Sequence, residues 1–238
     1  MDAVEDVKVG PLTAGSSSSS PSGCTTRRCV LKPGHGGLYW PVALATTDKV
    51  NKVWDLVSLH DSVSVILFNT DRQKLVMVRQ FRPAVYYSGI PKEARQASEG
   101  CIDTSKYPAR SGLTLELCAG IVDKQGSLEE GVRLEALEEC GYDVPLKNFE
   151  HVKTFRSGVG VSGDRQTMFY AEVTDKMKVS EGGGLEEEGE LIDVVEMSVP
   201  EVKDFLSKPE VLAPAGFLYA ISWFLLHKAP ATTTSAAT

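Results

Sequence analysis

Hydrophobic positions form two closely spaced β-like runs in the second quarter of the chain. Residues 62–68 (SVSVILF) and 75–80 (LVMVRQ) are both rich in β-branched and aliphatic side chains. Polar turn formers at residues 69–72 (NTDR) follow the first run. This pattern predicts an antiparallel hairpin.

A strand followed by a capped helix is predicted further along. The run Leu113–Cys118 predicts a strand that ends at residues 119–120. Ser127 then opens a helix, because Glu130 stands three residues later in the position of a capping box. Gly141 provides the C-terminal stop.

The rest of the pattern interleaves strands with helices. A further hairpin is predicted from residues 38–44 and 53–59, whereas residues 89–111 lack periodicity and are predicted to be irregular. Strands are also expected at 152–155, 168–173 and 191–197, and helices at 200–206 and 216–227. Hairpins mixed with helices indicate an α/β or α+β sandwich rather than a parallel array of Rossmann type.

Composition divides the chain into one main domain and flanking segments. With 238 residues, 42% of them hydrophobic, the chain is long enough to build one sizeable core. Residues 1–30 are expected to be a disordered tail, because the serine run 16–20 buries too little apolar surface to offset the entropy of ordering. We expect a β-extension at residues 31–60, the main domain at 61–230 and a flexible tail at 231–238.

Charge and cysteine content narrow the class of protein. The balance of 25 Lys and Arg against 32 Asp and Glu gives a net charge of −7, which disfavours non-specific binding of nucleic acid. The 5 cysteines are scattered without CxxC pairs, as in a reduced compartment. The most apolar stretch, 213–226, is shorter than the ~20 residues of a membrane span, and the N-terminus lacks a signal-peptide pattern. We therefore expect a cytoplasmic protein that binds neither nucleic acid nor membranes.

Three glutamates of the predicted helix gather near its buried face. At about 100° per residue, Glu135 and Glu139 continue the stripe of Leu128 and Val132, with Glu138 about 80° to one side. Carboxylates crowded beside apolar neighbours repel one another unless a cation compensates, and hard oxygen ligands select Mg²⁺ or Mn²⁺. A solvated acidic face is the alternative that the helix pattern alone leaves open.

The sequence around this helix favours the metal site. Residues 120–142 (GIVDKQGSLEEGVRLEALEECGY) closely resemble the Nudix box, G-x5-E-x7-R-E-U-x-E-E-x-G-U, where U is a bulky apolar residue. The resemblance implies the Nudix α/β/α sandwich with a mixed sheet. It also implies that Glu135, Glu138 and Glu139 bind Mg²⁺, or Mn²⁺ in its place, together with the Ala119 carbonyl oxygen.

Segments outside the box resemble the UDP-sugar (UDP-glucose) pyrophosphatase branch of this superfamily, which is related to the ADP-ribose pyrophosphatases. The resemblance covers about residues 38 to 230. The segments that carry it are Trp54-Asp55, His60–Val63, Val78–Tyr86, Gly158–Gly160, Gln166–Tyr170, Glu187–Ile192 and Ser222–Leu225, while Leu115–Gly120 is the strand that such boxes usually follow. Because the N-terminal strands pair between subunits in relatives, the resemblance implies a homodimer with residues 31–60 as a dimer contact.

Two positions depart from the box. Gly126 stands where the first glutamate is expected, and Leu134 stands where the arginine before Glu135 is expected. An arginine at position 134 would lie one turn before Glu138, within salt-bridge reach, and in the family it orients the ligand carboxylates. Leu134 does neither, and Arg133 is rotated about 100° away.

A second acidic segment follows three glycines near residue 184. The common outcome for such a charge run is a solvated loop. By resemblance, it is a loop that delivers a catalytic base, with Glu188 as the base, Glu187 as its rival and Glu190 as a further metal ligand. A glutamate beside a divalent cation is able to take the proton of an attacking water.

Two arginines are candidates for binding an anionic substrate. Arg79 and Arg82 lie at the end of the 75–80 strand, where the alternative is a pair of surface cations. A guanidinium bonds two phosphate oxygens at once, and we favour Arg82. Glu116, in an otherwise apolar strand, is either outward-facing or a pocket carboxylate, and we favour the pocket.

The resulting hypothesis is a Mg²⁺-dependent enzyme that cleaves the pyrophosphate of a nucleoside diphosphate sugar. It would convert UDP-glucose to UMP and glucose 1-phosphate, with ADP-ribose as a further candidate substrate. The alternative, motivated by Leu134, is a catalytically weak nucleotide-sugar-binding or scaffold protein. RNA processing is disfavoured by the acidic balance.

Overall fold

The computed structural model describes residues 29–31, 39–45, 51–97, 102–122, 126–185 and 190–230. The chain forms two compact units, one of residues 1–59 with 158–164 and one of residues 60–157 with 165–238. Apart from Cys29 and Val30, the two predicted tails lie outside the described residues.

The first unit contains a three-stranded antiparallel sheet. Its strands are β1 (Cys29–Leu31), β2 (Tyr39–Ala45) and β3 (Asn51–Val57), in that order. Residues 39–45 pair with 51–57 along their whole length, which confirms the predicted hairpin at the level of the backbone. Within the same unit, the amide of Val57 donates to the carbonyl of Val161 at 2.8 Å.

The second unit is built on a mixed seven-stranded sheet. Its strands are β4 (Ser62–Asn69), β5 (Lys74–Phe81), β6 (Leu113–Glu116), β7 (Cys118–Ile121), β8 (Glu150–Arg156), β9 (Arg165–Val173) and β10 (Ile192–Ser198). The main order is β10-β5-β4-β9-β8, in which β4 and β9 are parallel and the other neighbours are antiparallel. The mixed sheet and the β4–β5 hairpin were both predicted, and both are confirmed.

Strands β4 and β5 separate after a short paired stretch, and the next two strands fill the gap. Residues 67–69 of β4 pair with 74–76 of β5, and beyond that point β6 pairs with β5 while β7 pairs with β4. The single strand predicted at residues 113–118 is therefore wrong. Glu116 pairs with Val78 and Cys118 pairs with Val65, so the chain crosses from one strand to the other at Leu117.

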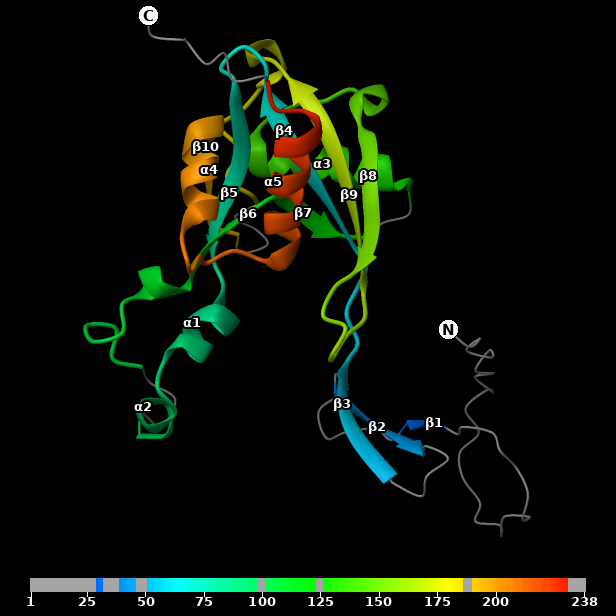
Figure 1. The fold of residues 1–238 in the computed structure, drawn as a ribbon, viewed down its shortest axis with the longest axis vertical. Helices are drawn as coiled ribbons and strands as arrows, with labels where there is room; N and C mark the ends of the chain where they lie inside the picture. The colour runs from blue at the N-terminus through cyan, green and yellow to red at the C-terminus, as the bar shows by residue number, and fades with distance from the viewer. Residues whose placement is uncertain are drawn as a thin grey trace, which may run out of the picture. The chain divides into compact units, whose positions relative to one another are not determined.

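Helices cover both faces of this sheet (Figure 1). Helix α3 (Leu128–Cys140) lies on one face, and α4 (Val199–Ser207) and α5 (Ala215–His227) lie on the other. The layered α/β/α sandwich predicted from the sequence is confirmed. Among the described residues, no helix is long and apolar enough to cross a membrane.

Residues 89–111, predicted to be irregular, contain α2 (Lys92–Ala97) and most of a 3₁₀ turn at Ala109–Gly112. A further short helix, α1 (Pro83–Gly89), directly precedes this segment. The prediction of an irregular segment is wrong in this respect. Helices of 7 and 6 residues are too short to produce a recognisable apolar periodicity, although Pro83 at the start of α1 is a typical first-turn residue.

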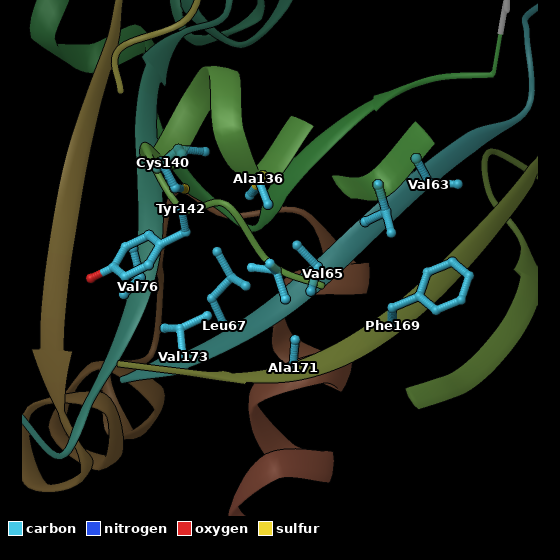
Figure 2. Packing of buried hydrophobic residues seen from close by; sticks show 14 of the residues in the cluster. Val63, Val65, Leu67, Val76, Ala136, Cys140, Tyr142, Phe169, Ala171 and Val173 are labelled. Carbon is cyan, nitrogen blue, oxygen red and sulfur yellow. The ribbon is translucent and has the colours of Figure 1, made fainter. Parts of the chain in front are cut away.

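Two hydrophobic clusters, one on each face, hold the layers together. Strand β4 contributes to both, because Val63, Val65 and Leu67 face α3 while Ile66 and Phe68 face α5. Figure 2 shows the first cluster, in which Ala136, Cys140 and Tyr142 approach the side chains of β4 and β9. Burial on both faces explains why residues 65–68 of β4 are all apolar.

Helix α3 begins and ends where the sequence predicts. Ser127 accepts a hydrogen bond from the amide of Glu130, and the Glu130 carboxylate accepts one from the amide of Ser127 at 2.8 Å. Gly141 adopts a left-handed conformation, with φ of 76°, and closes the helix. These local signals fix the length of the helix that carries the acidic residues.

Candidate active site

The carboxylate of Glu139 is buried at the contact between α3 and β7. Glu139 is 2% exposed, and its Oε2 atom accepts a hydrogen bond from the amide of Ala119 at 2.9 Å. Glu139 therefore ties the last turn of the helix to the strand beneath it.

Glu135 lies one turn earlier, directly against Gly120. A Cβ atom at Gly120 would lie 2.0 Å from the carboxyl carbon of Glu135. Real Cβ atoms do not approach other atoms so closely, so only glycine permits this contact without displacing the glutamate. The contact with Glu135 on the acidic helix therefore explains why the first residue of the box-like segment, Gly120, is a glycine.

The carboxylates of this region influence one another electrostatically. Burial, together with the negative charges of Glu135 and Glu190, raises the pKa of Glu139 to about 8. The hydrogen bonds that Ala119 and Cys118 provide lower the same pKa but do not offset burial. Burial and negatively charged neighbours therefore disfavour the ionised form of Glu139.

A triple-glycine loop brings Glu190 to this group. Gly182, Gly183 and Gly184 all have positive φ values, of 74°, 113° and 81°, which favour glycine. The amides of Gly183 and Gly184 donate to the carbonyls of Glu139 and Glu138 at 2.9 and 3.1 Å, at the end of α3. The loop thereby satisfies carbonyls that the helix leaves unpaired.

Glu190 closes the base of the same loop. Its carboxylate accepts a hydrogen bond from the amide of Leu185 at 3.0 Å. The sequence pattern indicated the glycines only as the start of an acidic segment and gave no sign of their contact with α3. The sequence signal for this role was the glycine triplet itself, because consecutive residues with positive φ demand glycine.

Of the predicted metal ligands, the structure thus gathers Glu135, Glu139, Glu190 and the backbone of Ala119. Glu138 is partly buried on the same turn as Glu139. Within the described ranges, no three Asp, Glu, His or Cys side chains are arranged closely enough to hold a metal ion. The donor set nevertheless fits a hard divalent cation, because its members are carboxylate and carbonyl oxygens and the buried Glu139 has a raised pKa.

Arg82 is held beside this acidic group by Glu116. Its Nε and Nη2 atoms donate to the two carboxylate oxygens of Glu116 at 2.8 and 2.7 Å, and Glu116 is 7% exposed. The hydrogen bond with Glu116 raises the pKa of Arg82, and the charges of Glu139 and Glu190 raise it further. The preferred reading of Glu116 as a pocket carboxylate is consistent with this burial.

Arg79 points elsewhere. Neighbouring residues of a strand face opposite sides, and Val78 belongs to the cluster beneath α3, so Arg79 lies on the face that carries α4 and α5. It pairs with Asp193 across β5 and β10 at 2.8 Å. The structure does not bring Arg79 together with the carboxylates of α3.

A cavity of about 480 Å³ opens beside Arg82. Arg82, Thr114 and Glu116 provide its polar lining, and the remaining lining residues are the aliphatic or small residues Ala84, Val85, Val211, Leu212, Ala213 and Pro214. Thr114 and residues 211–214 were not among the residues that the sequence pattern singled out. The cavity is large enough for part of a small organic substrate.

Leu134 lies one turn before Glu138 on α3 and lines the same small cavity as Glu135. This cavity, of about 60 Å³, is also lined by Val63, Ile121 and Leu128. Arg133, its neighbour, forms an ion pair with Asp143 at 2.6 Å. Arg133 is thus engaged with another residue and does not take the place of the expected arginine.

The two candidates for the catalytic base, Glu187 and Glu188, lie outside the described residues.

Comparisons with known proteins define the class to which this site belongs. The chain is 43% identical over 199 residues to uridine diphosphate glucose pyrophosphatase NUDT14 of Mus musculus, covering 77% of this chain and 86% of that protein. It is 44% identical over 187 residues to the protein of the same name from Bos taurus, covering 75% and 84%. A GDP-mannose pyrophosphatase of Enterobacter sp. (strain 638) is 28% identical over 153 residues, covering 63% and 66%.

The fold is also found in solved structures. A crystal structure of an ADP compounds hydrolase superposes with a TM-score of 0.59 and 14% identity, covering 88% of this chain and 100% of that one. No protein-family model matches the chain. The chain belongs to the Nudix hydrolase superfamily. Within that superfamily it falls in the branch of the UDP-sugar pyrophosphatases.

Replacing Gly120 by alanine tests the contact between β7 and Glu135. The new Cβ would displace the Glu135 carboxylate, which is the end of a flexible side chain, so we expect Mn²⁺ affinity to fall about tenfold while the fold persists. Titration calorimetry with MnCl₂ measures the affinity.

Gly131→Ala is the matched control within α3. A Cβ at Gly131 would make an ordinary contact of 3.8 Å with Val63, so this variant is expected to keep its Mn²⁺ affinity and to gain up to about 1 kcal/mol of stability. Equal Mn²⁺ affinities in Gly120→Ala and the wild type would show that Glu135 is not a ligand at this position.

Proposed function

We propose that this protein hydrolyses the pyrophosphate bond of UDP-glucose and releases UMP and glucose 1-phosphate. The observation that carries the proposal is the 43% identity to a relative named uridine diphosphate glucose pyrophosphatase, over 86% of that relative's length. The group of carboxylates next to an arginine supports the same chemistry, because a pyrophosphate substrate is anionic and requires positive partners. ADP-ribose is proposed as a further substrate.

We assign the divalent cation, Mg²⁺ with Mn²⁺ as a substitute, to the acidic end of α3. Glu135, Glu138 and Glu139 would hold it, with Glu190 and the Ala119 carbonyl as further ligands. When bound, the cation neutralises charge on the phosphoryl oxygens. The raised pKa of Glu139 supports this assignment. Burial and the negative charges of Glu135 and Glu190 disfavour its ionised form, and a bound divalent cation would stabilise it.

The chain's own positive group for the substrate is Arg82. Glu116 uses two of the five N–H donors of its guanidinium, which leaves three for phosphate oxygens. We assign phosphate binding to Arg82 rather than to Arg79, because Arg79 pairs with Asp193 on the opposite face of the sheet.

The proton of the attacking water requires a base near the cation. We assign this role to Glu188, with Glu187 as the alternative, because both lie between the glycine triplet and Glu190 in the sequence. The contact of the triplet with the end of α3 supports the assignment, since it holds the start of this segment beside Glu139.

We further propose that the protein is a cytoplasmic homodimer in which residues 31–60 contribute to the contact. The antiparallel hairpin of β2 and β3 supports this proposal, because it supplies strands outside the catalytic sheet.

The second candidate function is a protein that binds nucleotide sugars without efficient turnover. Leu134 favours it, because an apolar side chain occupies the position from which the expected arginine would orient Glu138.

An assay with UDP-glucose separates the two functions. We expect the purified protein to form UMP and glucose 1-phosphate with MgCl₂ and no products with EDTA. Glu138→Gln should lower the rate at least about a hundredfold without unfolding the protein, because it removes one negative ligand. Product formation is measured by anion-exchange chromatography.

Glu93→Gln, an exposed position on α2, is the control and should retain full activity. Full activity in Glu138→Gln would reject the role given to this glutamate, and binding of UDP-glucose without turnover in the wild type would favour the second candidate function.

Leu134→Arg tests the departure from the box directly. The guanidinium would reach Glu138 one turn later and hold it in ligand geometry, so we expect a higher kcat. Leu134→Met keeps the side chain apolar with a similar volume and should match the wild type. Identical rates for all three proteins would mean that another group already orients the carboxylates.

A further inference from the structure

The hydroxyl of Thr114 lies behind the pair formed by Arg82 and Glu116. Thr114 is 4% exposed and precedes Glu116 by two residues on β6, so both side chains face the same side of the sheet. Its Oγ1 donates a hydrogen bond to Oε1 of Glu116. The carbonyl of Gln80 lies 3.3 Å from the same hydroxyl. A hydroxyl has one proton, and the charged carboxylate is the stronger acceptor.

This hydrogen bond fixes the orientation of a carboxylate that would otherwise be able to rotate. The terminal torsion of a glutamate is broad, so the two oxygens of Glu116 meet Arg82 in the observed fork only if the carboxylate plane is held. Oε1 accepts from both Thr114 and the Nε of Arg82, and Oε2 accepts from Nη2. Thr114 therefore holds the carboxylate from the buried side.

Arg82 depends on that carboxylate for its own position. Its side chain is 46% exposed. Arg82 follows the last residue of β5 and belongs to neither a strand nor a helix. Arginine loses substantial rotamer entropy when it is held in one conformation, and the planar fork with Glu116 restricts it in advance. Arg82, Thr114 and Glu116 line the same cavity.

We propose that Thr114 is a positioning residue that sets substrate affinity by orienting Glu116, which in turn orients Arg82 toward the substrate's phosphates. This inference rests on the proposed function only in so far as Arg82 contacts a pyrophosphate group. Thr114 takes no part in the chemical step. Loss of its hydroxyl therefore weakens substrate binding much more than it slows the bound substrate's hydrolysis.

Three substitutions test this role. Thr114→Val removes the hydroxyl with little change in volume, Thr114→Ser keeps it, and Thr167→Val is the matched control. Thr167 is 5% exposed on β9, and its hydroxyl interacts with that of Thr154 at 3.1 Å. Thr114→Ala is measured in parallel, so that a folding defect of the valine variant does not end the test.

The first readout is steady-state hydrolysis of UDP-glucose. We expect Thr114→Val and Thr114→Ala to raise KM about tenfold and to change kcat less than about twofold. Thr114→Ser should have a KM close to that of the wild type, and Thr167→Val should leave both constants unchanged. Equal KM values in Thr114→Val, Thr167→Val and the wild type would overturn the inference.

The second readout is the affinity for inorganic pyrophosphate, measured by titration calorimetry on the same proteins with MgCl₂. Weaker binding in Thr114→Val, restored in Thr114→Ser, supports the positioning role even if the wild type does not hydrolyse UDP-glucose, in which case only the proposed function fails. Hydrolysis of UDP-glucose with unchanged pyrophosphate affinity and KM in Thr114→Val leaves the proposed function intact and rejects the inference. Failure of the wild type to bind pyrophosphate also rejects it.

Discussion

The close approach between helix α3 and strand β7 is the constraint on which the rest of the site depends. Gly120 allows the Glu135 carboxylate to lie against the strand, and the amide of Ala119 donates a hydrogen bond to the buried carboxylate of Glu139. Burial and the neighbouring negative charges of Glu135 and Glu190 disfavour the ionised form of Glu139. A divalent cation would offset this cost, because hard cations favour carboxylate and carbonyl oxygens as ligands.

The separation of β4 from β5 brings the acidic and basic parts of the site next to each other. Because the chain crosses from β5 to β4 at Leu117, β7 runs beneath α3 and β6 runs along β5. Glu116 thereby meets Arg82 on one side of the crossing, while Ala119 meets Glu139 on the other. A substrate with two linked phosphates would contact the guanidinium of Arg82 on one side of the crossing and a cation held by the glutamates of α3 on the other.

Local patterns in the sequence predicted the elements that depend on local interactions. The capping box of Ser127 and Glu130 and the left-handed Gly141 delimit α3, and both were readable because each acts within a few residues. The break at Leu117 was not readable, since it follows from the divergence of two other strands. Likewise, nothing near Thr114 indicates that its hydroxyl would meet Glu116 behind an arginine more than thirty positions earlier in the sequence.

The claim that the packing of α3 against β7 creates a cation site is tested most directly by thermal melting with and without Mg²⁺. Addition of MgCl₂ to the EDTA-treated wild type near pH 7.5 should raise the melting temperature by about 5 °C, because the ion binds the folded state alone. The shift should disappear in Glu139→Gln. A melting temperature that does not respond to Mg²⁺ or Mn²⁺ in the wild type would contradict the account.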